Sequence, residues 1–104
     1  MIINNINFLL PQIMMLCQEY NVNKLYVFGS VLTDKFNEQS DIDFIVDFDK
    51  KKITDYFNNY FDFKYSLENV FGRKVDLLEE KPIQNKYLKQ SIDNSKKLIY
   101  EGVL

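Results

Sequence analysis

The sequence predicts an α/β fold of the α+β kind, in which helices cover a small mixed β-sheet. Three observations predict it. Segments with helical periodicity alternate with short strand-like runs. The 104 residues are enough for one domain. Gly and Pro are scarce, so long loops are not expected. We therefore expect one domain over residues 1–104, with the order helix, strand, short helix, strand, helix, strand, helix.

The first elements follow from the spacing of apolar residues. Between Asn5 and Tyr20 these residues recur every three or four positions, which predicts a helix. Pro11 either kinks this helix or marks the first turn of a shorter one. After the break at residues 21–23, the β-branched and aromatic run Lys24–Phe28 predicts a strand. A short helix can follow over Ser30–Phe36.

The middle of the chain predicts two further strands around a second long helix. Asp41–Phe48 alternates between polar and apolar residues over most of its length, as a half-buried strand does. Thr54–Phe71 has helical spacing, and Gly72 is well placed to end that helix. Arg73–Leu78 then predicts the third strand.

The C-terminal part predicts a last helix that opens at Pro82. Leu88, Ile92 and Ile99 lie along one face of it, and Gly102 follows its end. From Lys81 to Lys97 there are five basic residues and one acid. This stretch can face an anion or an acidic partner, or it can be the solvated face of a basic helix.

Composition excludes several classes of protein. The formal charge of −2 gives no reason to expect direct binding of nucleic acid. The chain has no His and a lone Cys17, so zinc sites and intrachain disulfides are not expected. No basic N-terminal segment precedes an apolar run, and no apolar run approaches the roughly 20 residues of a membrane span. A cytoplasmic protein is the expectation.

Asp41 and Asp43 indicate a metal site. In a strand, residues two apart point to the same face, about 6.6 Å apart at roughly 3.3 Å per residue. Two carboxylates on one face repel each other unless a positive charge lies between them. Oxygen ligands prefer a hard cation such as Mg²⁺ or Mn²⁺. If the strand of Asp76 pairs beside theirs, Asp76 can join the same cluster.

Gly29 and Ser30 lie where the first strand ends and the short helix can begin. Glycine lets the backbone approach a phosphate closely, and a helix N-terminus offers free amides to an anion. The Ser30 hydroxyl can bind a phosphate oxygen or cap the helix. Taken alone, Gly-Ser is better explained as an ordinary turn between a strand and a helix with Ser30 as its N-cap, which is compatible with phosphate binding.

Together these motifs resemble the polymerase-β-type nucleotidyltransferase superfamily, and within it the minimal nucleotidyltransferase (MNT) domain. The resemblance rests on Gly29-Ser30, ten intervening residues, Asp41-Ile42-Asp43 and a third Asp in the later run Gly72–Leu78. It extends over essentially the whole chain and implies the nucleotidyltransferase fold.

The resemblance implies a role for each of these residues. Gly29 and Ser30 would hold the triphosphate of ATP or another nucleoside triphosphate. Asp41 and Asp43 would bind Mg²⁺ or Mn²⁺. Asp76 would complete the metal site and help to deprotonate the attacking hydroxyl, which displaces pyrophosphate from the α-phosphate. The stretch Val31–Phe36 departs from many relatives, which have an Arg-Ala-Arg-Gly-like segment there.

Three functions remain open at this point. MNT proteins of this size are commonly paired with a HEPN-domain RNase toxin, so the resemblance implies an MntA-like antitoxin that transfers AMP from ATP to a toxin tyrosine. The second reading is an antitoxin that masks the toxin without catalysis. The third is a nucleotidyltransferase acting on a small molecule such as an aminoglycoside, which would need a homo-oligomer to build its pocket.

Overall fold

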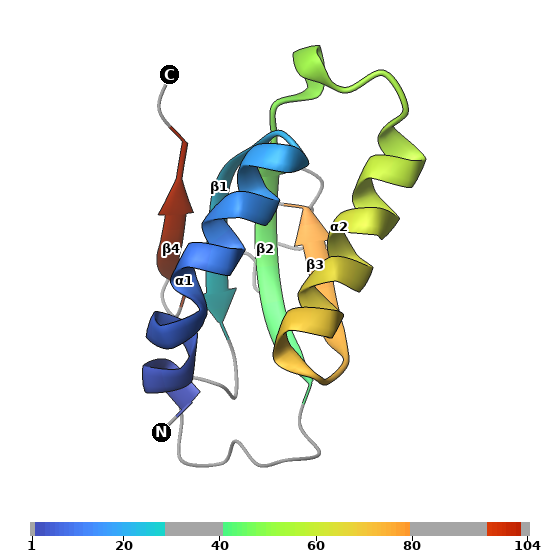
Figure 1. Cartoon of the computed structure of the whole chain (residues 1–104). Coiled ribbons are helices and arrows are strands. Elements are labelled where there is room, and N and C mark those ends of the chain that lie inside the picture. The colour runs from blue at the N-terminus through green and yellow to red at the C-terminus, as the bar shows by residue number, and fades with distance from the viewer. Residues whose placement is uncertain (1, 29–40, 80–95, 103–104) are drawn as a thin grey trace, which may run out of the picture.

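The computed structural model describes residues 2–28, 41–79 and 96–102 and contains a mixed four-stranded sheet with two long helices on one face (Figure 1). This confirms the predicted fold class. The short helix expected over Ser30–Phe36 and the helix start expected at Pro82 lie outside the described residues. Within the described part, no helix is long and apolar enough to cross a membrane.

The chain begins with α1 (Ile2–Glu19), which runs through Pro11. The prediction of one long helix is therefore confirmed, and the alternative of a shorter helix that begins near Pro11 is wrong. A tight turn at Asn21, with φ of 59°, leads into β1 (Val22–Phe28). The Asn21 carbonyl accepts a hydrogen bond of 2.8 Å from the amide of Asp49, which fixes the turn against the end of β2.

The sheet has the strand order β3-β2-β1-β4. β1 pairs antiparallel with both of its neighbours, β2 (Ile42–Phe48) and β4 (Lys97–Glu101). β2 pairs parallel with β3 (Val75–Glu79). Parallel neighbours need a crossover connection. The short 3-10 helix η2 (Lys50–Lys52) and α2 (Tyr56–Phe71) provide it.

The expectation of a helix over Ile99 is wrong, because this segment is the strand β4. Leu98, Ile99 and Tyr100 are residue types that favour strands, and β1 offers them an edge to pair with. Tyr100 pairs with Leu25 and Leu98 with Tyr26, so the register shifts by one residue at Ile99. This is a β-bulge, which places one extra residue in β4.

Both ends of α2 are fixed by local hydrogen bonds. Asp55 caps its start by accepting a hydrogen bond of 3.2 Å from the Asn58 amide. Gly72 ends it in the left-handed region, with φ of 67°, as the sequence predicts. The Glu68 side chain accepts a hydrogen bond of 3.0 Å from the Val75 amide, which ties the helix to the first residue of β3.

Alternation along β2 separates the two faces of the sheet. Ile42, Phe44 and Val46 are buried in the core beneath the helices, where Phe63 and Leu67 of α2 are also fully buried. The residues between them, Asp43, Ile45 and Asp47, therefore point to the other face, which we call the open face because neither long helix covers it, although Ile45 there is fully buried. The candidate functional residues are on this open face.

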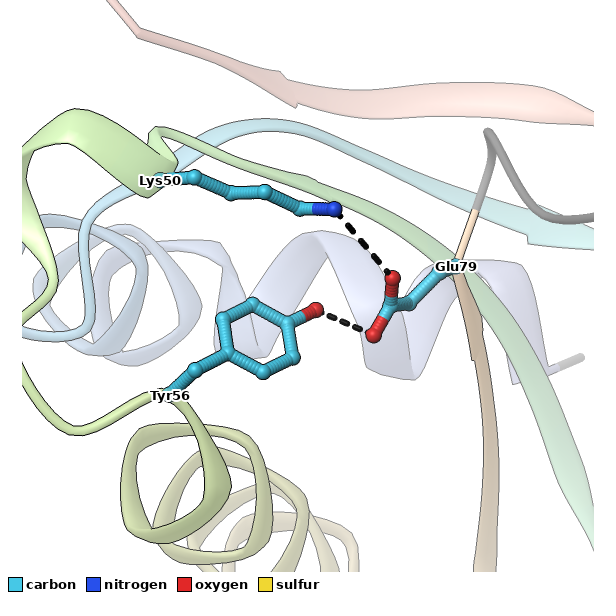
Figure 2. A network of polar contacts seen from close by, with 3 residues as sticks. All are labelled: Lys50, Tyr56 and Glu79. Carbon is cyan, nitrogen blue, oxygen red and sulfur yellow. Dashed lines mark hydrogen bonds and ion pairs between the residues drawn. The ribbon is translucent and has the colours of Figure 1, made fainter.

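On the helix side of the sheet, the negative charge of Glu79 is compensated by two neighbouring side chains. Figure 2 shows Glu79, at the end of β3, between Lys50 and Tyr56. The Lys50 Nζ lies 3.8 Å from Glu79 Oε2, and the Tyr56 hydroxyl donates a hydrogen bond to Glu79 Oε1. Burial and the neighbouring Glu79 carboxylate raise the pKa of Tyr56, so the phenol remains a proton donor at neutral pH.

The contribution of α2 to the core can be tested with two phenylalanines on the same helix. We expect Phe63→Ala to lower the free energy of unfolding by about 3 to 5 kcal/mol, because Phe63 is fully buried. Phe57 is 68% exposed, so the matched change Phe57→Ala should cost no more than about 1 kcal/mol. Urea denaturation measures both. Equal losses would contradict the described core.

Candidate active site

The parallel pairing of β2 and β3 sets Asp43 directly beside Asp76. The two residues are Cα partners in register. Strands in a sheet are about 4.8 Å apart, so two partner side chains on the same face are neighbours. The flanking partners, Ile42 with Val75 and Phe44 with Leu77, are buried in the core. Asp43 and Asp76 therefore both project from the open face.

The closeness of these two acids changes the chemistry of Asp43. Burial, a hydrogen bond with the Asp76 side chain, and the charges of Asp76 and Asp41 raise the pKa of Asp43 from 3.8 to about 6. A hydrogen bond between two carboxyl groups requires one proton between them. The pair thus holds a proton at a pH where an isolated aspartate has lost it. A site that favours positive charge in this way is suited to a cation.

The third predicted acid, Asp41, is exposed and lies just before β2. Its charge contributes to the raised pKa of Asp43, which places it near the pair. Within residues 2–28, 41–79 and 96–102, no three acidic, His or Cys side chains converge closely enough to form a ready metal site. The structure thus brings Asp43 and Asp76 together, with Asp41 at the edge of the pair.

The predicted phosphate-binding residues, Gly29 and Ser30, lie outside the described residues. Their place in the chain is still informative. Phe28, the last residue of β1, is the Cα partner of Asp43 on the side away from Asp76. The described part of β1 therefore ends beside the acid pair.

The acid pair is suited to a hard divalent cation. Its ligands are carboxylate oxygens, which Mg²⁺ and Mn²⁺ prefer. On the other face, the charge of Glu79 is compensated by Lys50 and Tyr56. Among the described residues, Asp43 and Asp76 have no such ion pair. A bound cation would supply the positive charge that the raised pKa of Asp43 favours between the two carboxyl groups.

Two open-face residues near the acid pair were not predicted to be functional, Tyr26 and Lys96. Tyr26 pairs with Ile45, two residues from Asp43. The Lys96 Nζ lies over the Tyr26 ring, 4.3 Å from its centroid. The residues that follow Lys96 favour strands, but we predicted a helix there, so the pairing of this segment with β1 was missed.

A cavity of about 300 Å³ lies at the other end of the sheet. Its lining includes Val22, where β1 begins, and Asp49, which follows β2. Asp43 is near the opposite ends of these two strands, so this cavity is separate from the acid pair. We assign it no function.

The proton shared by the acid pair leads to a prediction for Asp43. Because the folded chain raises its pKa, Asp43 destabilises the fold above pH 6, and this effect disappears as the pH falls towards 3.8. Asp76→Asn removes the neighbouring charge while the burial remains, so we expect the pKa of Asp43 to fall from about 6 towards its ordinary value. A carbon-13 NMR titration of the carboxyl group measures this pKa.

Asp47→Asn is the matched control, because Asp47 lies on the same strand and face but does not contribute to the raised pKa. The pKa of Asp43 should be the same in this variant as in the unchanged chain. A pKa near 4 in the unchanged chain would contradict the described contact between Asp43 and Asp76.

Solved structures share this fold. The structure of a proposed minimal nucleotidyltransferase matches with a TM-score of 0.73 and 22% identity, over 90% of this chain and 92% of that one. A toxin–antitoxin structure with AMP-PNP matches with a TM-score of 0.68 and 20% identity, over 89% and 73%. The tri-AMPylated Shewanella oneidensis HEPN toxin in complex with its MNT antitoxin matches with a TM-score of 0.61 and 18% identity, over 92% and 72%.

Sequence comparison shows the family of the chain, whereas these structural matches show only its fold. A proposed protein adenylyltransferase of Methanocaldococcus jannaschii is 39% identical over 82 residues, which are 79% of this chain and 79% of that protein. The polymerase beta nucleotidyltransferase family matches residues 11–102, a range that contains all five predicted site residues. The chain therefore belongs to the polymerase beta nucleotidyltransferase family.

Proposed function

We propose that this protein is a metal-dependent adenylyltransferase that moves AMP from ATP to a tyrosine hydroxyl of a HEPN toxin and so acts as its antitoxin. The observation on which this rests is the alignment of Asp43 with Asp76 on the open face, where their mutual repulsion favours a cation. We place the protein in the cytoplasm, where ATP and a toxin partner would be available.

In this proposal the acids hold the metal, the Gly-Ser pair holds the nucleotide, and Asp76 has a second task. Asp41, Asp43 and Asp76 hold Mg²⁺ or Mn²⁺, and Gly29 and Ser30 hold the triphosphate. Such a cation neutralises charge on the reacting phosphate oxygens. Asp76 is exposed on the open face, where it can also accept the proton of an attacking hydroxyl. The tyrosine oxygen then bonds to the α-phosphorus, and the bond from that phosphorus to the pyrophosphate oxygen breaks.

The exposure of two of the three acids supports a protein as the acceptor. Asp41 and Asp76 are both exposed. A small acceptor needs an enclosing pocket to be held in position. A protein can instead place its tyrosine by docking over the open face. The similar toxin–antitoxin complexes support a HEPN toxin as that protein.

We expect Asp43→Asn and Asp76→Asn each to reduce AMP transfer by at least about a hundredfold, because each removes a proposed metal ligand. The test is to co-express each variant with the HEPN protein from the neighbouring reading frame and to measure added AMP by mass spectrometry. Asp47→Asn should leave the modification unchanged. Equal modification in all variants would contradict the proposed site.

A second measurement separates catalysis from masking. Cell growth is followed while the toxin is expressed with the Asp41→Asn/Asp43→Asn double variant. Catalytic protection predicts that growth is lost with this variant and retained with Asp47→Asn. Growth that persists without any AMP on the toxin would show that binding alone neutralises it. Labelled ATP with an aminoglycoside panel tests the remaining alternative, and transfer there would replace the proposed acceptor.

A further inference from the structure

We propose that a cavity beside α2 is a second binding site, and that its ligand is an organic cation, an ammonium group that carries alkyl groups. The cavity has a volume of about 420 Å³, and we call it the aromatic cavity. Four aromatic side chains and one carboxylate line it: Tyr56, Phe57, Tyr60, Phe61 and Glu79. Its volume is within the range of small-ligand pockets, roughly 300 to 1,000 Å³.

The aromatic cavity is separate from the acid pair. Its four rings belong to α2, which packs on the helix side of the sheet. Asp43 and Asp76 project from the open face, on the other side. The proposed ligand is therefore neither the nucleotide nor the acceptor tyrosine, and this inference goes beyond the proposed function.

The rings of the aromatic cavity are inclined to one another. Phe57 and Phe61 are one helical turn apart, with ring centroids 4.8 Å apart and an interplanar angle of 51°. The rings of Tyr60 and Phe61 are 5.0 Å apart and nearly perpendicular, at 83°. Phe57 is 68% exposed, so this group of rings is accessible from solvent. A ligand in the cavity can thus contact several rings at once.

Hydrogen bonds to β3 hold two of these rings in position. The Tyr56 hydroxyl donates to the Glu79 carboxylate (Figure 2), and the Tyr60 hydroxyl donates to the Leu77 carbonyl. Each ring is therefore fixed at both ends, by α2 and by the strand. Side chains that are already ordered lose little conformational entropy when a ligand binds.

The chemistry of the lining favours a cation. The face of an aromatic ring is negative, and several rings together recognise quaternary ammonium ligands. Glu79 adds a carboxylate to the rings. The chain's own Lys50 shows that these groups attract an ammonium, because its Nζ lies 5.5 Å from the centroid of the Tyr56 ring and 3.8 Å from Glu79 Oε2 (Figure 2).

Lys50 competes with such a ligand but does not fill the cavity, since it is not among the residues that line it. Its side chain is 58% exposed. Exposed ion pairs of this kind contribute little free energy, so an incoming cation can replace Lys50 at Glu79. Alkyl groups on the cation would also remove apolar surface of the rings from water, which the compact ammonium of lysine does less well.

The experiment is an NMR titration of the unchanged chain, followed through the proton–carbon signals of its aromatic rings. The probes are choline and its neutral carbon analogue, 3,3-dimethylbutan-1-ol, at one ionic strength set with sodium chloride. We expect choline to shift the ring signals with a Kd on the order of 1 mM, and the neutral analogue to bind at least about fivefold more weakly. Neither ATP nor a toxin is needed, so the result is independent of the proposed function.

Substitutions on α2 locate the binding site. Phe57→Leu and Phe61→Leu remove a ring and should each weaken choline binding at least about threefold. Tyr65→Leu is the matched control, because Tyr65 is an exposed ring on the same helix that does not line the cavity. It should change the affinity less than about twofold. Each variant is first shown to unfold at the same urea concentration as the unchanged chain.

The role of charge is tested with two opposite changes. Glu79→Gln removes the carboxylate and should weaken choline binding severalfold, whereas Lys50→Gln removes the competing ammonium and should strengthen it about twofold. Lys51→Gln changes the net charge as Lys50→Gln does, but Lys51 neither contacts Glu79 nor lines the cavity. It should leave the affinity unchanged. An apolar groove without preference for cations would show none of these differences.

The cation can come from a free small molecule or from a basic side chain of another protein. Nα-acetyl-Nε-trimethyl-lysine amide carries the same headgroup as choline on a peptide-like stem and represents the second source. Tighter binding of this probe than of choline would assign the site to a protein side chain, and the reverse to a small molecule. Equal affinities for choline and its neutral analogue, or no shift of the ring signals with choline, would overturn the proposal.

Discussion

The candidate site depends on the in-register parallel pairing of β2 with β3. This pairing brings Asp43 and Asp76 together from distant parts of the sequence. Because side chains alternate along a strand, a slip of one residue would turn Asp76 towards the core and Val75 towards the open face. The core prevents such a slip, since Val75 and Leu77 are buried beneath α2 only in the observed register. Packing on one face thus fixes the geometry on the other.

The carboxylates on the two faces of the sheet differ in whether neighbouring groups compensate their charge. On the helix side, Glu79 is paired with Lys50 and accepts a hydrogen bond from Tyr56. On the open face, Asp43 and Asp76 are side by side and raise the free energy of the folded chain when both are ionised. A fold selected for stability alone would separate them or add a base. Unfavourable pairs of this kind are typical of sites whose charge is balanced by a ligand.

Much of the fold could be predicted from the sequence, because most elements have a clear local pattern. The spacing of apolar residues indicated both long helices, and Gly72 marked the end of α2. The strand β4 could not be predicted in this way, since five residues are too few to show a period. Its conformation depends on pairing with β1, which is distant in sequence, and such pairing overrides local preference.

The candidate site was predictable to a similar extent. The spacing of Asp41 and Asp43 indicated a metal site, and the strand around Asp76 was assigned correctly. Only coordinates could show that Asp43 and Asp76 are in register while Asp41 lies at the edge. The position of Lys96 over Tyr26 depends on the missed strand, so no local pattern could reveal it.

The bulge at Ile99 has a consequence for the charge of the open face. It offsets β4 by one residue, so that Leu98 and not Ile99 is opposite Tyr26. With regular pairing from Tyr100 onward, Lys97 would be opposite Phe28 and Lys96 would shift beyond the end of β1. The bulge at Ile99 therefore determines whether Lys96 or Lys97 is on the same face of the sheet as the acids. Two relatives with the same composition in this strand could differ at the site through backbone geometry alone.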